Sequence, residues 1–192
     1  MRRVADEVKL PAGYRIAWGG QFKSQKRATA RLAVIIPPSL VGIFVLLFWM
    51  FRSMRKALLI LVTVPFTLIG GLGGLALAGL HLSISVAVGF LAVAGISVQN
   101  GAIMVEQIIA LQRERFALDA AVIEGATQRL RPILMTALMA SFGLPPAALP
   151  HGIGSEMQRP FAVVIVGGIV SATLIALNLL PLLFPLIVGE RE

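Results

Sequence analysis

The chain is divided into long apolar blocks, and this division limits its fold more than any other feature. The blocks cover residues 32–51, 57–80, 82–111, 132–149 and 161–188, with few or no charges in each. About 20 helical residues are needed to cross the roughly 30 Å apolar core of a bilayer. The apolar residues are continuous rather than alternating, which favours helices over a membrane barrel. We therefore expect an all-α membrane protein, a bundle of five transmembrane helices.

Residues 1–31 are charged and mixed, and they lack the apolar core of a signal peptide. Within this stretch, bulky side chains alternate with other side chains at residues 14–18 (YRIAW), and a turn signal lies on each side of them. This pattern predicts a short strand. Residues 21–31 predict a polar helix that leads into the first block. Because one strand cannot form a stable sheet alone, we expect residues 1–31 to be the trailing strand and helix of a longer domain.

The stretch between the third and fourth blocks is polar with a repeating apolar face. It predicts an amphipathic helix over about residues 115–130, lying on the membrane surface. The fourth block ends in a cluster of helix breakers, and the fifth is expected to open with Pro160, a residue favoured in the first helical turn.

Basic residues set the expected orientation. The net charge is +8, and the first and third loops hold most of the charge between blocks: Arg52, Arg55, Lys56, Arg113, Arg115, Arg129 and Arg131. In the loops on the opposite side, the only lysine or arginine is Arg159. Because basic loops stay in the cytoplasm, these loops and the tail 189–192 are predicted to be cytoplasmic and residues 1–31 to lie outside. The basic residues within 1–31 conflict with this unless a large translocated domain precedes them, so we expect the chain to be part of a longer protein.

The same placement of charge argues against nucleic acid as a partner, since the basic residues flank membrane spans. The chain has no cysteine, so thiolate metal sites and disulfides are excluded. His81 and His151 lie at separate span ends and are interpreted as interface residues. No nucleophile–base pair and no phosphate-binding loop is found. We expect no enzymatic activity, no resident metal and no cofactor.

Small residues predict where helices touch. Gly70 and Gly74 form a small-xxx-small pattern in the second block, and Gly167 and Ser171 repeat it in the fifth. We interpret these four residues as helix-packing positions without a ligand.

Polar residues within the third block call for a different explanation. Gln99 and Glu106 share one helical face, with Asn100 beside them. Polar groups inside a span are functional candidates. The alternatives are that Gln99 and Asn100 only hydrogen-bond between helices, and that Glu106, near the cytoplasmic end, is simply solvated.

Four ordered motifs carry a family resemblance: GISVQNGAIMVE (95–106), RLRPILMTAL (129–138), GIGSEMQRP (152–160) and VGGIVSATLIALNLLPLLF (166–184). With them, the chain resembles the C-terminal membrane half of a resistance-nodulation-division (RND) efflux pump. The form SEMQRP is similar to the heavy-metal (CzcA-like) branch rather than the drug-exporting branch.

The resemblance implies that the five spans are helices eight to twelve of such a pump, and that residues 1–31 end a periplasmic porter domain. It implies a secondary active transporter in the bacterial inner membrane that exports divalent heavy-metal cations by proton antiport. The implied partners are the first membrane half and porter domains of the same chain, two further copies in a homotrimer, a periplasmic adaptor, an outer-membrane channel and the lipid bilayer.

The resemblance also implies roles for single residues. The position of Gln99 faces carboxylates on the fourth helix of related pumps, which this chain lacks, and a glutamine there cannot titrate. Arg129 and Thr136 match positions of the proton-coupling network. The residues alone are equally consistent with two simpler alternatives. Arg129 is then an anchor at the cytoplasmic surface, and Thr136 is hydrogen-bonded to its own helix.

Two other functions stay open at this stage. One is export of drugs or other small molecules by the same family. The other is a truncated membrane remnant that transports nothing.

Overall fold

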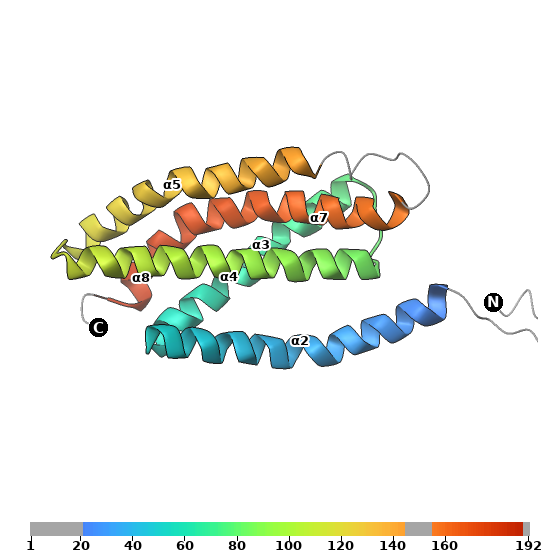
Figure 1. The fold of residues 1–192 in the computed structure, drawn as a ribbon, viewed down its shortest axis with the longest axis horizontal. Coiled ribbons are helices and arrows are strands. Elements are labelled where there is room, and N and C mark those ends of the chain that lie inside the picture. The colour runs from blue at the N-terminus through green and yellow to red at the C-terminus, as the bar shows by residue number, and fades with distance from the viewer. Residues whose placement is uncertain (1–20, 145–154, 190–192) are drawn as a thin grey trace, which may run out of the picture.

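A computed structural model of the chain describes residues 21–144 and 155–189, and these contain helices and no strand. The helices are α2 (Gln21–Phe51), α3 (Met54–Leu77), α4 (Ile84–Arg113), α5 (Leu118–Gly143) and α7 (Ser155–Leu174), and α7 continues through a π-helix, η1 (Ile175–Leu179), into α8 (Leu180–Ile187) (Figure 1). The predicted all-α bundle is confirmed. The predicted strand at residues 14–18 lies outside the described residues.

Local chemistry explains where the helices end. α3 is followed by Gly79 with a φ of 64°, a left-handed conformation that glycine adopts without strain. α4 begins after Ser83, whose hydroxyl accepts a hydrogen bond from the backbone N–H of Val86 at 3.3 Å. Arg52 and Arg115 have φ values of 49° and 70° and turn the chain after α2 and α4. The helices are therefore joined by tight turns at these points, which makes neighbours antiparallel.

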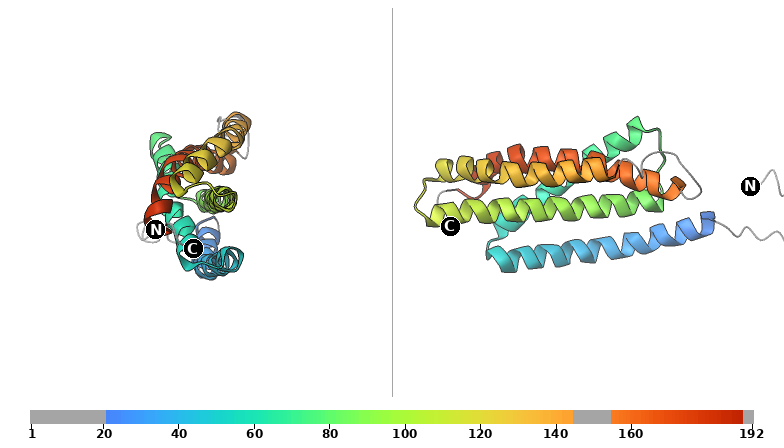
Figure 2. Two further views of the ribbon diagram at one scale, coloured as in Figure 1. Left: turned by 90° about the vertical axis from the view of Figure 1, so that its left-hand side faces the viewer. Right: turned by 45° about the horizontal axis from the view of Figure 1, so that its top comes forward.

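Helix α3 lies at the centre of the bundle, with α7 and α4 packed against it, while α2 lies at the edge (Figure 2). Of the apolar part of α2, only 6% is buried, compared with 44% for the segment that runs from α7 into α8. The largest core cluster joins α3, α4 and α8, and its largest enclosed side chains are Leu59, Ile60, Met104, Ile108, Leu180 and Phe184. This cluster fixes the end of α4 that carries Glu106.

Four helical segments are long and apolar enough to cross a membrane: Val34–Phe51, Met54–Leu77, Ile84–Arg113 and Met157–Ile187. They correspond to the first, second, third and fifth predicted blocks. The predicted polar helix over 21–31 is present as the start of α2, joined to the first block without a break.

The fourth block differs from the prediction. The expected surface helix and the expected span are one helix, α5, which runs through Pro132 and ends at Gly143. Proline removes one backbone hydrogen bond and crowds the preceding turn, which bends a helix without necessarily ending it. There is thus no helix boundary near residue 131, and residues 145–149 lie outside the described part of the chain.

The last helix also begins earlier than expected. α7 starts at Ser155, so Pro160 lies inside the helix and not in its first turn. Further along, the helix widens to η1 just before Pro181. The side-chain amide of Asn178 donates to the carbonyl oxygen of Leu174 at 2.9 Å there. A widened turn gives room for a carbonyl that Pro181 would otherwise crowd.

Candidate functional site

Gln99 lies on α4 in a stripe that no other described helix covers. The exposed residues of this stripe are Val88, Leu91, Gly95, Gln99, Glu106 and Ala110. The Gln99 side chain makes no hydrogen bond among the described residues. A neutral amide that can both donate and accept is thus presented to whatever covers this face of α4.

Asn100 and Glu106 are on the same helix but in different surroundings. Asn100 is half-buried and has no hydrogen-bond partner within residues 21–144 and 155–189. Glu106 is exposed and lines a cavity that Lys56 and Arg113 also line. Interhelical hydrogen bonds therefore do not explain Gln99 and Asn100 within the described chain. The one cross-helix polar contact nearby joins the hydroxyls of Ser97 and Thr63 at 3.5 Å.

Arg129 is the centre of a polar network between α4 and α5. Its Nη2 donates to Oε1 of Gln107 at 2.8 Å, and Nε2 of Gln107 donates to Oε1 of Gln128 at 2.6 Å. Nε2 of Gln128 in turn donates to Oε1 of Glu124 at 2.9 Å. The guanidinium is thereby linked to a carboxylate through two amides rather than by a direct ion pair.

Part of the guanidinium is left without a partner. The Nε of Arg129 is buried and is the only buried side-chain nitrogen or oxygen in the described chain that lacks an acceptor. An unsatisfied buried donor is unfavourable and calls for an explanation. The geometry holds Arg129 between helices, which a simple surface anchor would not require.

Thr136 lies seven residues after Arg129 on α5 and is exposed. Its hydroxyl donates to the carbonyl oxygen of Ile133 at 2.9 Å, so it is bonded to its own helix. The oxygen still has lone pairs that can accept. Thr136 and Arg129 therefore share a helix, but no hydrogen bond joins them.

The four small residues come together between α3 and α7. A Cβ placed on Gly70 would collide with Ser171 and with the Gly167 carbonyl, and one on Gly74 would lie 3.2 Å from the carbonyl oxygen of Val163. The Ser171 hydroxyl donates to the carbonyl oxygen of Thr67 at 2.6 Å, across 104 residues of sequence. This contact positions α7 against α3 and presents no side chain to a ligand.

Sequence reasoning assigned no role to three members of the network: Gln107, which lies beside Gln99 and Glu106 on the same helix, Gln128 and Glu124. Two features of the sequence are consistent with this network. Glu124 and Gln128 are four residues apart on one helix face, and Gln107 is a further amide in an apolar block. The pairing across helices depends on how α4 and α5 are packed. Among the described residues, no group of three His, Cys, Asp or Glu side chains could hold a metal ion.

Comparisons with known proteins decide the family. The model of the AcrB/AcrD/AcrF family matches residues 1–188. The chain belongs to this family. The resemblance to RND pumps is thus confirmed. With its apolar helices, this family member is a multi-pass membrane protein.

The relatives of this family member place it in the heavy-metal branch. It is 47% identical over 183 residues to the cobalt-zinc-cadmium resistance protein CzcA of Cupriavidus metallidurans, covering 95% of this chain and 17% of the relative. It is 46% identical over 189 residues to the nickel and cobalt resistance protein CnrA of the same organism, covering 98% and 18%.

A solved structure gives the same result. A crystal structure of a heavy metal efflux pump matches with a TM-score of 0.79 and 48% identity, over 97% of this chain and 19% of that one. The chain therefore spans less than a fifth of the length of the relatives it matches.

Proposed function

We propose that this chain is the C-terminal membrane segment of a proton-coupled exporter of divalent heavy-metal cations. The observation that carries the proposal is the similarity, over nearly the whole chain, to proteins named for resistance to cobalt, zinc, cadmium and nickel. On this proposal residues 1–31 and 151–160 lie in the periplasm, and the turns after α2 and α4 lie in the cytoplasm.

The polar side chains have separate roles in this proposal. Gln99, in the uncovered stripe of α4, donates a hydrogen bond to a titrating carboxylate that another part of the pump supplies. Its amide does not titrate, so it orients the carboxylate in either protonation state. Asn100 lies beside it as a second neutral donor and acceptor.

Arg129 provides the fixed positive charge. Its Nη1, which is neither enclosed nor hydrogen-bonded among the described residues, can donate to an acceptor from another part of the pump, and a charged donor makes a stronger hydrogen bond than a neutral one. Thr136 offers its oxygen as an acceptor on the same helix. Glu106 lies outside this set, in the cavity at the end of α4. The homotrimer, the adaptor and the outer-membrane channel are part of the same proposal.

A chimera tests the function. Residues 1–188 replace the matching C-terminal segment of CzcA, and a metal-sensitive strain that makes the adaptor and channel is grown on zinc, cobalt, cadmium and nickel. We expect the chimera to restore growth on at least one of these metals and the 192-residue chain alone to restore none.

Two controls make the result decisive. A chimera with Arg129→Leu should be produced and inserted but give no resistance. If the unaltered chimera is inserted at the level of CzcA and gives no resistance to any of the metals, the proposed function is wrong. Resistance from the 192-residue chain alone would contradict the need for the rest of the pump.

A further inference from the structure

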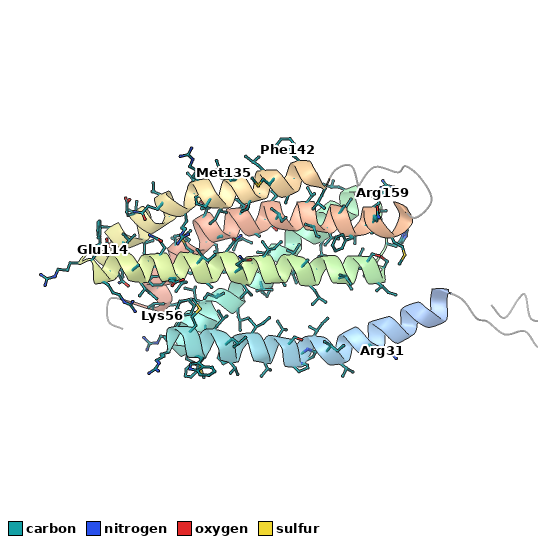
Figure 3. All side chains as sticks on the ribbon, in the orientation of Figure 1. Arg31, Lys56, Glu114, Met135, Phe142 and Arg159 are labelled. Atoms are coloured by element: carbon teal, nitrogen blue, oxygen red, sulfur yellow. The ribbon has the colours of Figure 1, made fainter. Side chains whose placement is uncertain are left out.

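A cavity of about 1050 Å³ opens at one end of the bundle, and none of the residues that line it belongs to the polar network of Arg129. It is formed where α2 ends, α3 begins, α4 ends and the turn into α5 follows, and its polar lining includes Lys56, Glu106, Gln112 and Arg113. Figure 3 shows Lys56 and Glu114 toward the same end of the molecule, opposite to Arg159. The cavity thus lies where apolar spans give way to polar turns, which is the level of lipid headgroups.

Lys56 is the residue that makes this cavity unusual. Only 7% of the residue is exposed, and its ammonium group makes no ion pair or hydrogen bond with the described residues. The Nζ atom itself is not enclosed, because Arg129 Nε is the only enclosed unpaired side-chain nitrogen or oxygen among them, and Lys56 lines the cavity. Glu106 lines the same cavity, but the two charges are not in contact as an ion pair. The cavity therefore presents an ammonium group that can bind an acceptor from outside the described chain.

The charges and walls of the cavity indicate what would supply that acceptor. Two cations, Lys56 and Arg113, face one carboxylate, Glu106, so the lining has an excess of positive charge. Apolar side chains, including Phe51 and Ile109, form the rest of the wall. A ligand with an anionic head and an apolar body fits both features, and basic pockets between transmembrane helices recognise phosphate headgroups.

We propose that this cavity binds the headgroup of an anionic phospholipid, with its phosphate on Lys56 and Arg113. The proposal concerns a lipid site and does not depend on metal export. The chemistry it requires is a phosphate group, which a lipid or free phosphate could both provide. The cavity lies at the end of the spans and has apolar walls, and both features favour a lipid over free phosphate. The other occupant to be tested is an acidic side chain from the part of the pump outside this chain.

Native mass spectrometry can test the site on the protein purified in mild detergent, both as the 192-residue chain and within the CzcA chimera. The probes are phosphatidylglycerol, phosphatidylethanolamine and inorganic phosphate. We expect phosphatidylglycerol to bind most tightly. Lys56→Gln should weaken it about tenfold, as the loss of one charge-assisted hydrogen bond would, and Lys56→Arg should preserve it.

The matched control is Arg55→Gln, which removes the same charge from the exposed neighbouring residue. It should leave binding unchanged. Arg113→Gln, also at an exposed position, should weaken binding and keeps the test decisive if Lys56→Gln does not fold. Circular dichroism melting curves establish folding of each variant.

Four results would overturn the proposal. Equal weakening by Arg55→Gln would mean that only general surface charge attracts the lipid. If neither Lys56→Gln nor Arg113→Gln weakened binding, the lipid would not bind at this cavity. Displacement of the lipid by inorganic phosphate would identify free phosphate as the ligand. Binding to the isolated chain but not to the chimera would mean that the rest of the pump fills the cavity.

Discussion

Arg129 holds a permanent charge at a half-buried position, and its hydrogen bonds are incomplete. Gln107 accepts from Nη2, while the buried Nε has no acceptor in the described chain. An arginine presents five donors in a fixed plane, so the bond from Nη2 to Gln107 also fixes where Nε lies. The packing of α4 and α5 thus encloses one donor of a charged group without pairing it.

Removing Gln107 should show how far the network stabilises the fold. Gln107→Leu leaves the charged Nη2 without its acceptor, so we expect the free energy of unfolding to fall by about 1.5–3 kcal/mol. The matched control is Gln112→Leu, a similar half-buried glutamine on α4 whose side chain makes no hydrogen bond among the described residues. Unfolding in mixed detergent, followed by circular dichroism, measures both. Equal losses in the two variants would show that the Arg129 contact contributes nothing special.

Substitutions of Gln99 should separate charge from hydrogen bonding in the chimera. Gln99→Lys should disturb proton-coupled metal flux, since a fixed ammonium holds a nearby carboxylate ionised and moves the flux profile to lower pH. Gln99→Leu should do less, because a neutral hydrogen bond is typically worth about 0.5–1.5 kcal/mol.

Leu91→Lys, in the same exposed stripe of α4, controls for the cost of inserting a charge. It should leave the pH profile unaltered. The prediction is contradicted if Gln99→Lys leaves the pH profile of flux unchanged while Gln99→Leu abolishes flux. That result would show that Gln99 is not beside the coupling carboxylate.

At the scale of the elements, the contact between α3 and α7 is the most extensive in the bundle. It depends on the absence of side chains at Gly70 and Gly167, which lets the Ser171 hydroxyl reach the backbone of α3. Such close approach gains dispersion contacts that larger residues would prevent.

Two alanine substitutions on α3 should therefore have opposite effects. Gly70→Ala forces a methyl group against Ser171 and the Gly167 carbonyl, so we expect a loss of about 1–3 kcal/mol in the free energy of unfolding. Gly73→Ala meets nothing within 4 Å and should be neutral or stabilising by up to about 1 kcal/mol. Detergent unfolding compares them. Equal stability of the two variants would mean that α3 and α7 are not in this contact.

The sequence predicts some of these elements better than others, for physical reasons. Apolar blocks of spanning length give α3 and α4 within a few residues, because hydrophobic length decides the outcome. Hydrophobic length does not predict that α5 is one continuous helix, because Pro132 and the charges of Arg129 and Arg131 suggest a helix boundary there. Gln99 and Arg129 were identified as candidates from sequence, but the bond from Arg129 to Gln107 depends on the packing of two helices. Neither pattern nor propensity contains that information.

On the scale of the whole molecule, the basic residues of the turns between helices gather at one end. The turns after α2 and α4 lie there, whereas Arg159 and also Arg31 of α2 lie toward the other end (Figure 3). Basic turns favour the cytoplasmic side. The natural absence of cysteine makes this orientation directly measurable.

Cysteine labelling should report opposite sides for the two ends. A membrane-impermeant maleimide should label His81→Cys in spheroplasts, and it should label Glu114→Cys only after the membrane is opened. Both positions are exposed, so accessibility of the side chain itself is matched. Labelling of Glu114→Cys in intact spheroplasts would reverse the assigned orientation.

The hydrogen bond between Ser171 and Thr67 also has a consequence in time. The two residues are 104 positions apart, and ribosomes add about 5–20 residues per second. Helix α3 must therefore wait roughly 5–20 s in the membrane before its partner is synthesised. Throughout that interval the face of α3 that packs against α7 lacks this partner, so lipid or another helix must cover it.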